Sequence, residues 1–573
     1  MPKVKFLPQN VIVEVPVGVT LLEAARQTGI DVESPCNGAG TCEKCKVRVL
    51  YGKTGEEQTS KGSCSLPKGD RLKGWVLACH ATVTEDLGVE TPKVNHNEHQ
   101  ILSTGQAHKR QLRPWINKIY DSTLDFTRTY AGERVISEHQ GDTTDRTYGL
   151  AVDIGTTTLV VALVDLLTGR ELGAVSAINP QTVFGHDVLS RIQFAGEGDG
   201  LKILQERLIA ELNRMTTEVA ARHEVHRDFI YEAVLSGNTT MLHLAVGADP
   251  RSLGRYPYTP VIRGGNSFPA SQIGLRIAPE GEVYLPPIFD GFVGADITAG
   301  ALVTELDSLD GITLFVDVGT NGEMILAVHG KLYATSTAAG PAFEGMNISC
   351  GMRAAEGAIE VFLINDNGHM ESRTIGNAPA VGICGSGLVD IVGELVARGI
   401  IEKTGRFSKK PRMLGERLVK VEGSSAFALE NDVYLTQKDV RQVQLAKGAI
   451  RAGIDTLLKF GEIAPEQVDR VLIAGSFGYH LRPQSLINLG LLPAAFDGKI
   501  DFVGNTSKSG AQAFLLDRVA REEINTVVQN TPSVDLAHAP DFEKVFVDAL
   551  SFPEPPVPEV ADETQQAIST ARR

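Results

Sequence analysis

Two copies of one short motif end an apolar run in an aspartate and then turn through a glycine. In the first copy, Asp153 closes the run and Gly155, Thr156 and Thr157 follow it. A tight glycine turn exposes backbone N–H groups to phosphate oxygens, hydroxyls add donors, and a carboxylate at a strand end can hold hydrated Mg²⁺. A second apolar run returns after the turn, so residues 151–163 predict strand, turn and strand.

The second copy lies at residues 314–326, where Asp317 is followed by Gly319, Thr320 and Asn321. A single copy would fit an ordinary hairpin with a glycine turn equally well. Two copies with similar flanks favour a duplicated unit that binds phosphate. The two aspartates are therefore the candidate catalytic residues, with the predicted roles of holding Mg²⁺ and orienting water.

Small residues later in the chain predict contacts to the remainder of a nucleotide. The strand-like run 471–474 closes on small residues, whose backbone can approach a flat adenine and ribose. Two further small-residue loops each precede a predicted helix. Lys447, on a helix just before this run, either reaches ribose or phosphate or is a solvated lysine. The candidate nucleotide-binding residues in this part of the chain are Gly340, Gly385, Lys447, Gly475, Ser476 and Gly478.

Four cysteines have the spacing of ligands to a metal cluster. Cys36, Cys42 and Cys45 follow a C-x5-C-x2-C pattern, and Cys79 ends a later apolar run. Cys64 is the alternative fourth ligand, but its surroundings are typical of a loop, so Cys79 is preferred. A structural zinc site and unligated buried cysteines are the alternatives to an iron–sulfur cluster. Zinc sites usually pair two short C-x2-C hairpins, and the second pair is missing here.

Composition indicates a soluble protein of several domains. The 573 residues are 42% hydrophobic and 22% charged, and no run approaches the ~18 apolar residues of a membrane span. A net charge of -15 argues against nucleic acid and anionic lipid as partners. No signal peptide is visible, so we expect a cytoplasmic protein, in which clustered cysteines point to metal ligation more than to disulfides.

The chain divides by its patterns into a small domain, a connecting segment, a large core and a tail. The small domain begins with two alternating strands and one helix. The connecting segment is polar and without periodicity, which predicts a linker with one helix or a reduced middle domain. The tail is rich in Pro, Glu and Thr, which predicts disorder. The predicted boundaries are 1–91, 92–147, 148–310 and 311–550 for two duplicated halves of the core, and 551–573.

The two halves of the chain resemble two known folds. The paired phosphate motifs, followed late in the chain by the run 471–474 and its small residues, resemble the actin, sugar-kinase and Hsp70 (ASKHA) ATPase superfamily. That resemblance implies a duplicated α/β core binding ATP and Mg²⁺. The cysteine spacing resembles the adrenodoxin-like [2Fe-2S] ferredoxins and implies a β-grasp domain. The overall fold class is therefore multidomain α/β, with a ferredoxin-like domain, a linker and an actin-like ATPase domain.

This combination resembles the reductive activators of corrinoid proteins. Residues 179–181, 440–450 and 504–507 look like patterns of that family. The resemblance implies ATP-dependent transfer of an electron from the [2Fe-2S] cluster to a Co(II) corrinoid protein, giving Co(I). It also implies a homodimer and an upstream electron donor such as a reduced ferredoxin or a reductase. Relatives can carry a sizeable middle domain, for which residues 92–147 leave little room.

Two other functions remain open from the sequence. The chain could be an adaptor for electron transfer whose ATPase half only senses ADP or ATP. It could also be a small-molecule kinase with an appended ferredoxin. A kinase needs a substrate pocket with a catalytic carboxylate, and the sequence does not show one clearly.

Overall fold

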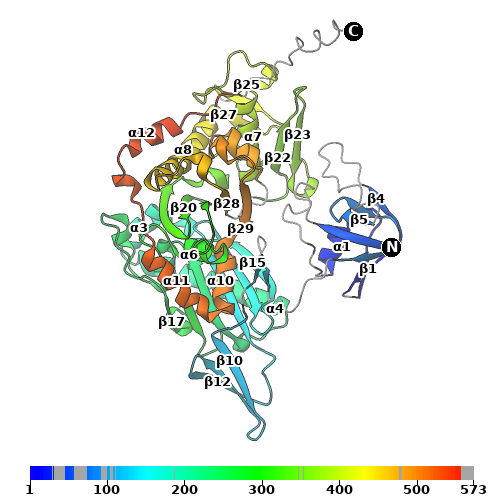
Figure 1. The fold of residues 1–573 in the computed structure, drawn as a ribbon, viewed down its shortest axis with the longest axis vertical. Coiled ribbons are helices and arrows are strands. Elements are labelled where there is room, and N and C mark those ends of the chain that lie inside the picture. Colours follow the sequence, from blue (N-terminus) through cyan, green and yellow to red (C-terminus); the bar gives the residue numbers. More distant parts are fainter. Residues whose placement is uncertain are drawn as a thin grey trace.

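The computed structural model consists of a small N-terminal body and a larger remainder with two halves (Figure 1). Figure 1 shows the small body in blue, one half of the remainder in cyan and green, and the other mostly in yellow. The structure describes residues 1–8, 10–28, 30, 32, 45–56, 74–91, 100–102, 107–109, 111–185, 187–345, 347–352, 354–421, 423–475 and 481–555.

The N-terminal body is a β-grasp domain, as the sequence predicted. Its elements are β1 (Lys3–Leu7), β2 (Val11–Glu14), α1 (Leu21–Gln27), β3 (Lys46–Tyr51), β4 (Thr54–Glu56), β5 (Trp75–Leu77), β6 (Ala81–Val83) and β7 (Leu87–Glu90). The main sheet has the order β2-β1-β7-β3-β5, with β1 parallel to β7. Val4 and Phe6 alternate along β1 and are fully buried with Leu21 of α1, because a half-buried strand turns every second side chain inward.

Residues 92–147 were predicted to be a linker with one helix or a reduced middle domain, and their described part folds into strands with no helix. These are β8 (Gln100–Leu102), β9 (Ala107–Lys109), β10 (Ile116–Asp121), β11 (Phe126–Ala131) and β12 (Arg134–Gln140). Strands β10, β11 and β12 form an antiparallel sheet whose Ile116, Ala131 and Ile136 join the core of the first half. Buried and exposed residues alternate along β11, which is the strand period that the many polar side chains concealed.

The first half of the remainder is built on a six-stranded sheet. Its elements are β13 (Tyr148–Ile154), β14 (Thr158–Asp165), β15 (Glu171–Ile178), η1 (Pro180–Val183), α3 (Val188–Ala195), α4 (Gly200–Arg222), η2 (Arg227–Phe229), β16 (Ile230–Gly237), α5 (Thr239–Val246), η3 (Arg251–Gly254), β17 (Asn266–Pro269), η4 (Ala270–Ile273), β18 (Glu282–Leu285) and α6 (Ala295–Val303). The strand order is β15-β14-β13-β16-β18-β17. The apolar residues of α4 recur at four-residue spacing, as expected of a helix with one buried face, and Leu204, Leu208 and Leu212 pack into the core.

The second half is built on a five-stranded sheet with the order β21-β20-β19-β28-β29. Its elements are β19 (Ile312–Val318), β20 (Asn321–Val328), β21 (Lys331–Ala338), η5 (Pro341–Glu344), β22 (Ala358–Ile364), β23 (Met370–Thr374), η6 (Ile375–Asn377), β24 (Gly382–Ile383), α7 (Gly385–Ala397), η7 (Gly415–Arg417), β25 (Leu418–Val421), β26 (Ser424–Ala428), β27 (Tyr434–Thr436), α8 (Gln437–Phe460), η8 (Pro465–Gln467), β28 (Arg470–Ala474), α9 (Pro483–Asn488), η10 (Ala494–Phe496), β29 (Ile500–Gly504), α10 (Thr506–Leu516), α11 (Arg518–Asn530), η11 (Leu536–His538) and α12 (Phe542–Ala549). None of the helices in the described ranges is long and apolar enough to cross a membrane.

The two halves repeat one arrangement of strands, as the paired motifs predicted. In the first half, β13 pairs antiparallel with β14 and parallel with β16, so that Asp153 lies beside Ser236. In the second half, β19 pairs antiparallel with β20 and parallel with β28, so that Asp317 lies beside Ala474. Both aspartates therefore end the central strand of a sheet, with the glycine turn immediately after it.

The halves are joined through a close crossing of helices α6 and α10. Although α10 belongs to the second half by its place in the sequence, it packs against β13 and β16 of the first half. A Cβ on Gly510 of α10 would lie 2.3 Å from the Cβ of Ala299 on α6, a distance that no side chain tolerates. Only glycine permits this approach, so the two helices form a tight pivot between the sheets.

The C-terminal segment packs on the second half up to residue 555, which corrects the prediction that disorder begins at 551. Phe552 is 1% exposed, and its N–H donates to Lys403 O at 3.0 Å. A single large aromatic side chain anchors the segment, and composition averaged over the tail concealed it. Residues 556–573 lie outside the described part of the chain.

Candidate nucleotide and cluster sites

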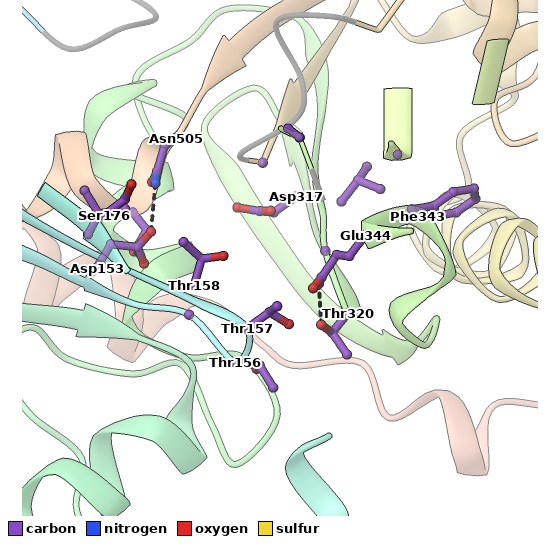
Figure 2. Close-up of a pocket in the computed structure, with 18 of the residues that line it drawn as sticks. Asp153, Thr156, Thr157, Thr158, Ser176, Asp317, Thr320, Phe343, Glu344 and Asn505 are labelled. Atoms are coloured by element: carbon purple, nitrogen blue, oxygen red, sulfur yellow. Dashed lines mark hydrogen bonds between the residues drawn. The ribbon is translucent and has the colours of Figure 1, made fainter. Parts of the chain in front are cut away.

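A cleft of about 650 Å³ lies where the two strand–turn–strand units face each other (Figure 2). Thr156 and Thr157 line it from the first turn, and Thr320 lines it from the second. Figure 2 shows Asp153 and Asp317 within the same cleft, carried by the two different sheets. The structure thus brings together both copies of the predicted motif.

The first turn has a geometry that requires glycine. The N–H of Gly155 donates to Thr158 O at 3.0 Å, and a Cβ on residue 155 would lie 2.5 Å from that oxygen. Thr157 Oγ1 is buried and has no hydrogen-bond partner among the described residues. A buried hydroxyl without a hydrogen-bond partner costs free energy. A phosphate oxygen that accepts a hydrogen bond from this hydroxyl would recover that cost.

The second turn is held from behind by the chain that follows β21. Gly319 N–H donates to Asn321 O at 3.0 Å, and Gly340 N–H donates to Thr320 O at 2.8 Å. Thr320 Oγ1 donates to one oxygen of Glu344, whose other oxygen is buried without a partner among the described residues. Gly340 therefore supports the turn and is not itself one of the residues lining the cleft.

The amino end of α10 holds the carboxylate of Asp153. Asn505 Nδ2 donates to one oxygen of Asp153, and Ser507 Oγ donates to the other, both at 2.7 Å. Ser507 is also hydrogen-bonded to Ser236 at 2.9 Å. From the sequence, residues 504–507 were only a family pattern. The structure gives them the task of orienting the first catalytic candidate.

Two further carboxylates, Asp296 and Glu323, join Asp153 and Asp317 in the cleft. Burial, with a further contribution from the neighbouring carboxylates, raises the pKa of Asp317 to about 8 and the pKa of Asp296 to about 7. The pKa of Glu323 lies well above its usual range for the same two reasons. Four buried acids cannot all ionise beside one another without a compensating cation.

Sequence reasoning missed Asp296 and Glu323, although each had a signal. Asp296 lies in the first turn of α6, a helix whose start was recognised without assigning its acid a role. Glu323 pairs directly with Asp317 across β19 and β20, so both carboxylates lie on one face of the sheet. An acid inside the otherwise apolar run 314–326 was the observation to pursue.

The donor set fits a magnesium nucleotide. Within the described ranges, no group of three or more His, Cys, Asp or Glu side chains lies close enough to hold a metal ion. Mg²⁺ usually takes one or two carboxylates and completes its shell with water and substrate phosphates. The buried carboxylates, the free hydroxyl of Thr157 and the two glycine turns are the partners that such a complex needs.

Some of the residues predicted to contact the rest of the nucleotide line the cleft, and others lie outside the described residues. Gly475 and Gly385 line the cleft. Gly475 has φ of +121°, and a Cβ there would lie 2.6 Å from Val318 O, so glycine lets β28 and the second turn approach. Ser476 and Gly478 lie outside the described residues.

Lys447 does not reach the cleft, contrary to the prediction that it contacts ribose or phosphate. Its Nζ donates to Ser551 O and lies 5.0 Å from the centre of the Phe552 ring. The side chain is 1% exposed, and burial lowers the pKa of Lys447 to about 7. Lys447 therefore secures the C-terminal segment, and the expectation of disorder in that segment concealed its partner.

Two of the four predicted cluster ligands lie within the described residues. The Sγ atoms of Cys45 and Cys79 are 3.2 Å apart and buried in the ferredoxin-like domain. Their hydrogen bond lowers the pKa of the Cys45 thiol, which favours the thiolate that binds metal. Cys36, Cys42 and the alternative ligand Cys64 lie outside the described residues.

Fold and site together define an iron–sulfur protein with an ATPase core of the actin, sugar-kinase and Hsp70 type. Family models match three ranges, described as a 2Fe-2S iron-sulfur cluster binding domain at 4–84, the RACo middle region at 148–309, and the C-terminal domain of RACo, the ASKHA domain, at 311–561. Full-length relatives agree with this assignment. The chain belongs to the family of reductive activators of corrinoid proteins.

Three relatives place the chain in this family. The corrinoid activation enzyme RamQ of Eubacterium limosum is 30% identical, covering 91% of this chain and 94% of its own length. The [Co(II) methylated amine-specific corrinoid protein] reductase of Methanosarcina barkeri is 27% identical, covering 71% of this chain and 77% of its own length. The solved structure of a reductive activator for corrinoid, iron–sulfur protein is 33% identical, with a TM-score of 0.73, covering 97% of this chain and 99% of that structure.

The family's middle region is present in this chain, which corrects the expectation that there is little room for it. That region matches residues 148–309, the range that the sequence assigned to the first half of the ATPase core. The coverage of 99% leaves no large domain of the solved relative without a counterpart.

We predict that Cys79→Ala abolishes the cluster, since a [2Fe-2S] centre needs four cysteine ligands. The wild-type protein should contain two irons and two sulfides per chain, by analogy with that cluster type. Iron content and visible absorption measure the result. Cys64→Ala and Cys350→Ala, the controls, should keep the cluster. Loss of the cluster in Cys64→Ala with retention in Cys79→Ala would reverse the ligand assignment.

We predict that Lys447→Met leaves nucleotide affinity within about twofold of wild type, because the amine contacts the C-terminal segment and not the cleft. Titration calorimetry with ATP measures this, with exposed Lys438→Met on the same helix as the control. A tenfold loss confined to Lys447→Met would restore the nucleotide role.

The same variant tests the lowered pKa of Lys447. Between pH 7 and pH 10.5 the unfolded chain keeps a proton that the folded protein releases, so the folded state gains stability as pH rises. Wild type should therefore gain stability relative to Lys447→Met between pH 7 and 9, by up to about tenfold in the unfolding equilibrium per pH unit. Parallel pH profiles of the two melting temperatures would contradict this.

Proposed function

We propose that this protein uses ATP to drive an electron from its [2Fe-2S] cluster onto the Co(II) of a corrinoid protein, giving Co(I). One observation carries the proposal. The same chain has a ferredoxin-type domain and a cleft, lined by carboxylates, between two duplicated strand–turn–strand units. The names of the relatives support the substrate class, because they describe activation or reduction of corrinoid proteins.

Energetics explain why an electron-transfer protein would need ATP. A plant-type [2Fe-2S] cluster has a potential near about -400 mV. If the cobalt couple is more negative, each ~59 mV of one-electron gap costs a factor of ten in equilibrium. Nucleotide must then supply the difference by changing the partner's affinity or the cobalt's coordination. Such a coupling is reciprocal, so the corrinoid partner would also change the affinity for nucleotide.

The residues of the cleft have distinct proposed roles. Asp153 and Asp317 would hold Mg²⁺, which supplies charge compensation for the phosphates. Asp153 has both oxygens engaged by α10, whereas Asp317 has no side-chain hydrogen bond to the described residues. Asp317 is therefore free to orient the attacking water and accept its proton, while the water oxygen bonds to the γ-phosphorus and the bond to the β–γ bridging oxygen breaks.

The two turns and the late small residues would bind the nucleotide itself. The Gly155 and Gly319 turns present backbone N–H groups and hydroxyls to the phosphates. Gly385 and Gly475, which line the cleft, would contact the adenosine. A Cβ at either position would meet backbone, so glycine lets the neighbouring chain pack closely there. Ser476 and Gly478 continue the adenosine loop in this proposal.

The source of electrons and the assembly complete the proposal. A reduced ferredoxin or a reductase would reduce the cluster, since the donor needs a potential at least as negative as that of the cluster. The family resemblance supports a homodimer. Cys350 and Cys384 are free thiols, which supports a reducing, cytoplasmic location.

The adaptor that only senses nucleotide is the alternative to test. It shares the cluster and the cleft but requires no hydrolysis for electron transfer. The small-molecule kinase is less well supported, because the four carboxylates lie together in the cleft. One experiment distinguishes these functions. The protein is mixed with an electron source and a Co(II) corrinoid protein, with and without ATP, and the cobalt spectrum shows whether Co(I) forms.

We predict that Asp317→Asn loses at least about a hundredfold of ATP hydrolysis, the usual contribution of a positioned acid or base. The cluster lies in a different domain and should accept an electron at an unchanged potential. Co(I) should no longer accumulate. Visible spectroscopy follows cluster and cobalt together, and exposed Asp366→Asn is the control. Wild-type cobalt reduction by a variant without hydrolysis would favour the adaptor.

A further inference from the structure

Three fully buried polar side chains, Asn179, Gln181 and Arg191, hold the backbone of the first phosphate turn. Asn179 Nδ2 donates to Gly155 O at 2.9 Å, and Arg191 Nη2 donates to Thr156 O at 2.5 Å. Gln181 Oε1 accepts from Arg191 Nη1 at 3.3 Å. We call this set the turn support. It joins η1 and α3 to the turn between β13 and β14.

The turn support fixes the direction of the amides that face phosphate. A peptide group is planar and trans, so its C=O and the N–H of the next residue point in opposite directions. Holding Gly155 O directs the N–H of Thr156 away from Asn179, and holding Thr156 O directs the N–H of Thr157 away from Arg191. Both threonines line the cleft, and neither N–H donates to any described residue. These two amides remain free for an anion.

Arg191 also carries a charge that the protein leaves without an ion pair. The guanidinium donates to three oxygens, of Thr156, Gln181 and Gly185, and lies 3.2 Å from Met241 Sδ. It forms no salt bridge with a carboxylate of the described chain. Asp187 and Glu344 attract the guanidinium only at longer range, and burying a charge without a direct ion pair is costly. Burial lowers the pKa of Arg191 only to about 10, so it stays charged at neutral pH.

The second phosphate turn has no guanidinium in the place that Arg191 takes at the first phosphate turn. The carbonyl of Thr320, equivalent in position to Thr156, accepts from the backbone N–H of Gly340. Pro180 and Pro341 follow the third strand of each half at equivalent places, so the two supports derive from one duplicated arrangement. A guanidinium therefore replaces a backbone amide in the first half only.

We infer that the turn support positions the first phosphate turn, and that Arg191 supplies the positive charge which lets an anionic nucleotide enter a cleft lined by carboxylates. Asn179 and Arg191 turn two amides toward the phosphate, and the phosphate serves as the counter-ion of Arg191 across the turn. Arg191 acts through the turn and is a positioning residue. This inference rests on the proposed binding of ATP in the cleft.

The test is Arg191→Met, which keeps the length of the side chain and removes its charge. Titration calorimetry compares ATP with adenosine, and hydrogen exchange follows the amides of Thr156 and Thr157. We expect at least a tenfold loss of ATP affinity, an adenosine affinity within about twofold of wild type, and loss of amide protection by ATP. Arg191→Lys keeps the charge but cannot hold Thr156 O and Gly185 O together, so its loss should be intermediate. Exposed Arg207→Met is the matched control.

The outcomes separate this inference from the proposed function. Arg191→Met leaves the oxygens of Thr156, Gln181 and Gly185 without a donor, so its melting temperature should fall whatever the role of Arg191. A merely structural arginine predicts equal losses of affinity for ATP and adenosine, whereas the turn support predicts a loss for ATP alone. Wild-type ATP affinity and amide protection in Arg191→Met would overturn the turn support and leave the proposed function standing. Absence of ATP binding in wild type itself would refute the proposed function. If Arg191→Met does not fold, the ATP-to-adenosine ratio of Arg191→Lys decides.

Discussion

The repulsion among four buried carboxylates is the constraint on which the rest of the structure depends. Asp153 and Asp296 come from the first half and Asp317 and Glu323 from the second, so closing the cleft brings like charges together. Burial raises the pKa of all four, and neighbouring carboxylates contribute to the rise at Asp296, Asp317 and Glu323. A magnesium nucleotide offers the charge that offsets both effects. Binding of nucleotide and the approach of the two halves are therefore one linked equilibrium.

The fold gives that equilibrium a mechanical output. Each half ends its central strand in an aspartate and a glycine turn, and α6 crosses α10 too closely for the helices to slide. Asn505 and Ser507 connect the pivot to the site directly, because they begin α10 and hold Asp153. The proposed function requires that nucleotide in the cleft be coupled to the binding of the redox partner.

Much of the fold followed from the sequence, because periodicity and paired motifs are local signals. The β-grasp domain, the two strand–turn–strand units and helix α4 were predicted. The sheet at residues 116–140 was missed, since its outward polar residues masked the alternation. Asp296 and Lys447 show the second limit: which side chains face a cleft depends on contacts far apart in sequence. Secondary-structure propensity does not predict such contacts. Only the folded structure shows that Asp296 lines the cleft and that Lys447 is buried against the C-terminal segment.

The central claim is that ATP drives the electron uphill, and the cobalt spectrum of a Co(II) corrinoid protein tests it most directly. The protein, with its cluster held reduced at a fixed potential, is mixed with that partner alone, with ATP, and with a non-hydrolysable analogue. The account predicts that Co(I) accumulates with ATP to at least ten times the level reached without nucleotide, corresponding to ~59 mV or more. Equal Co(I) in all three mixtures would contradict it.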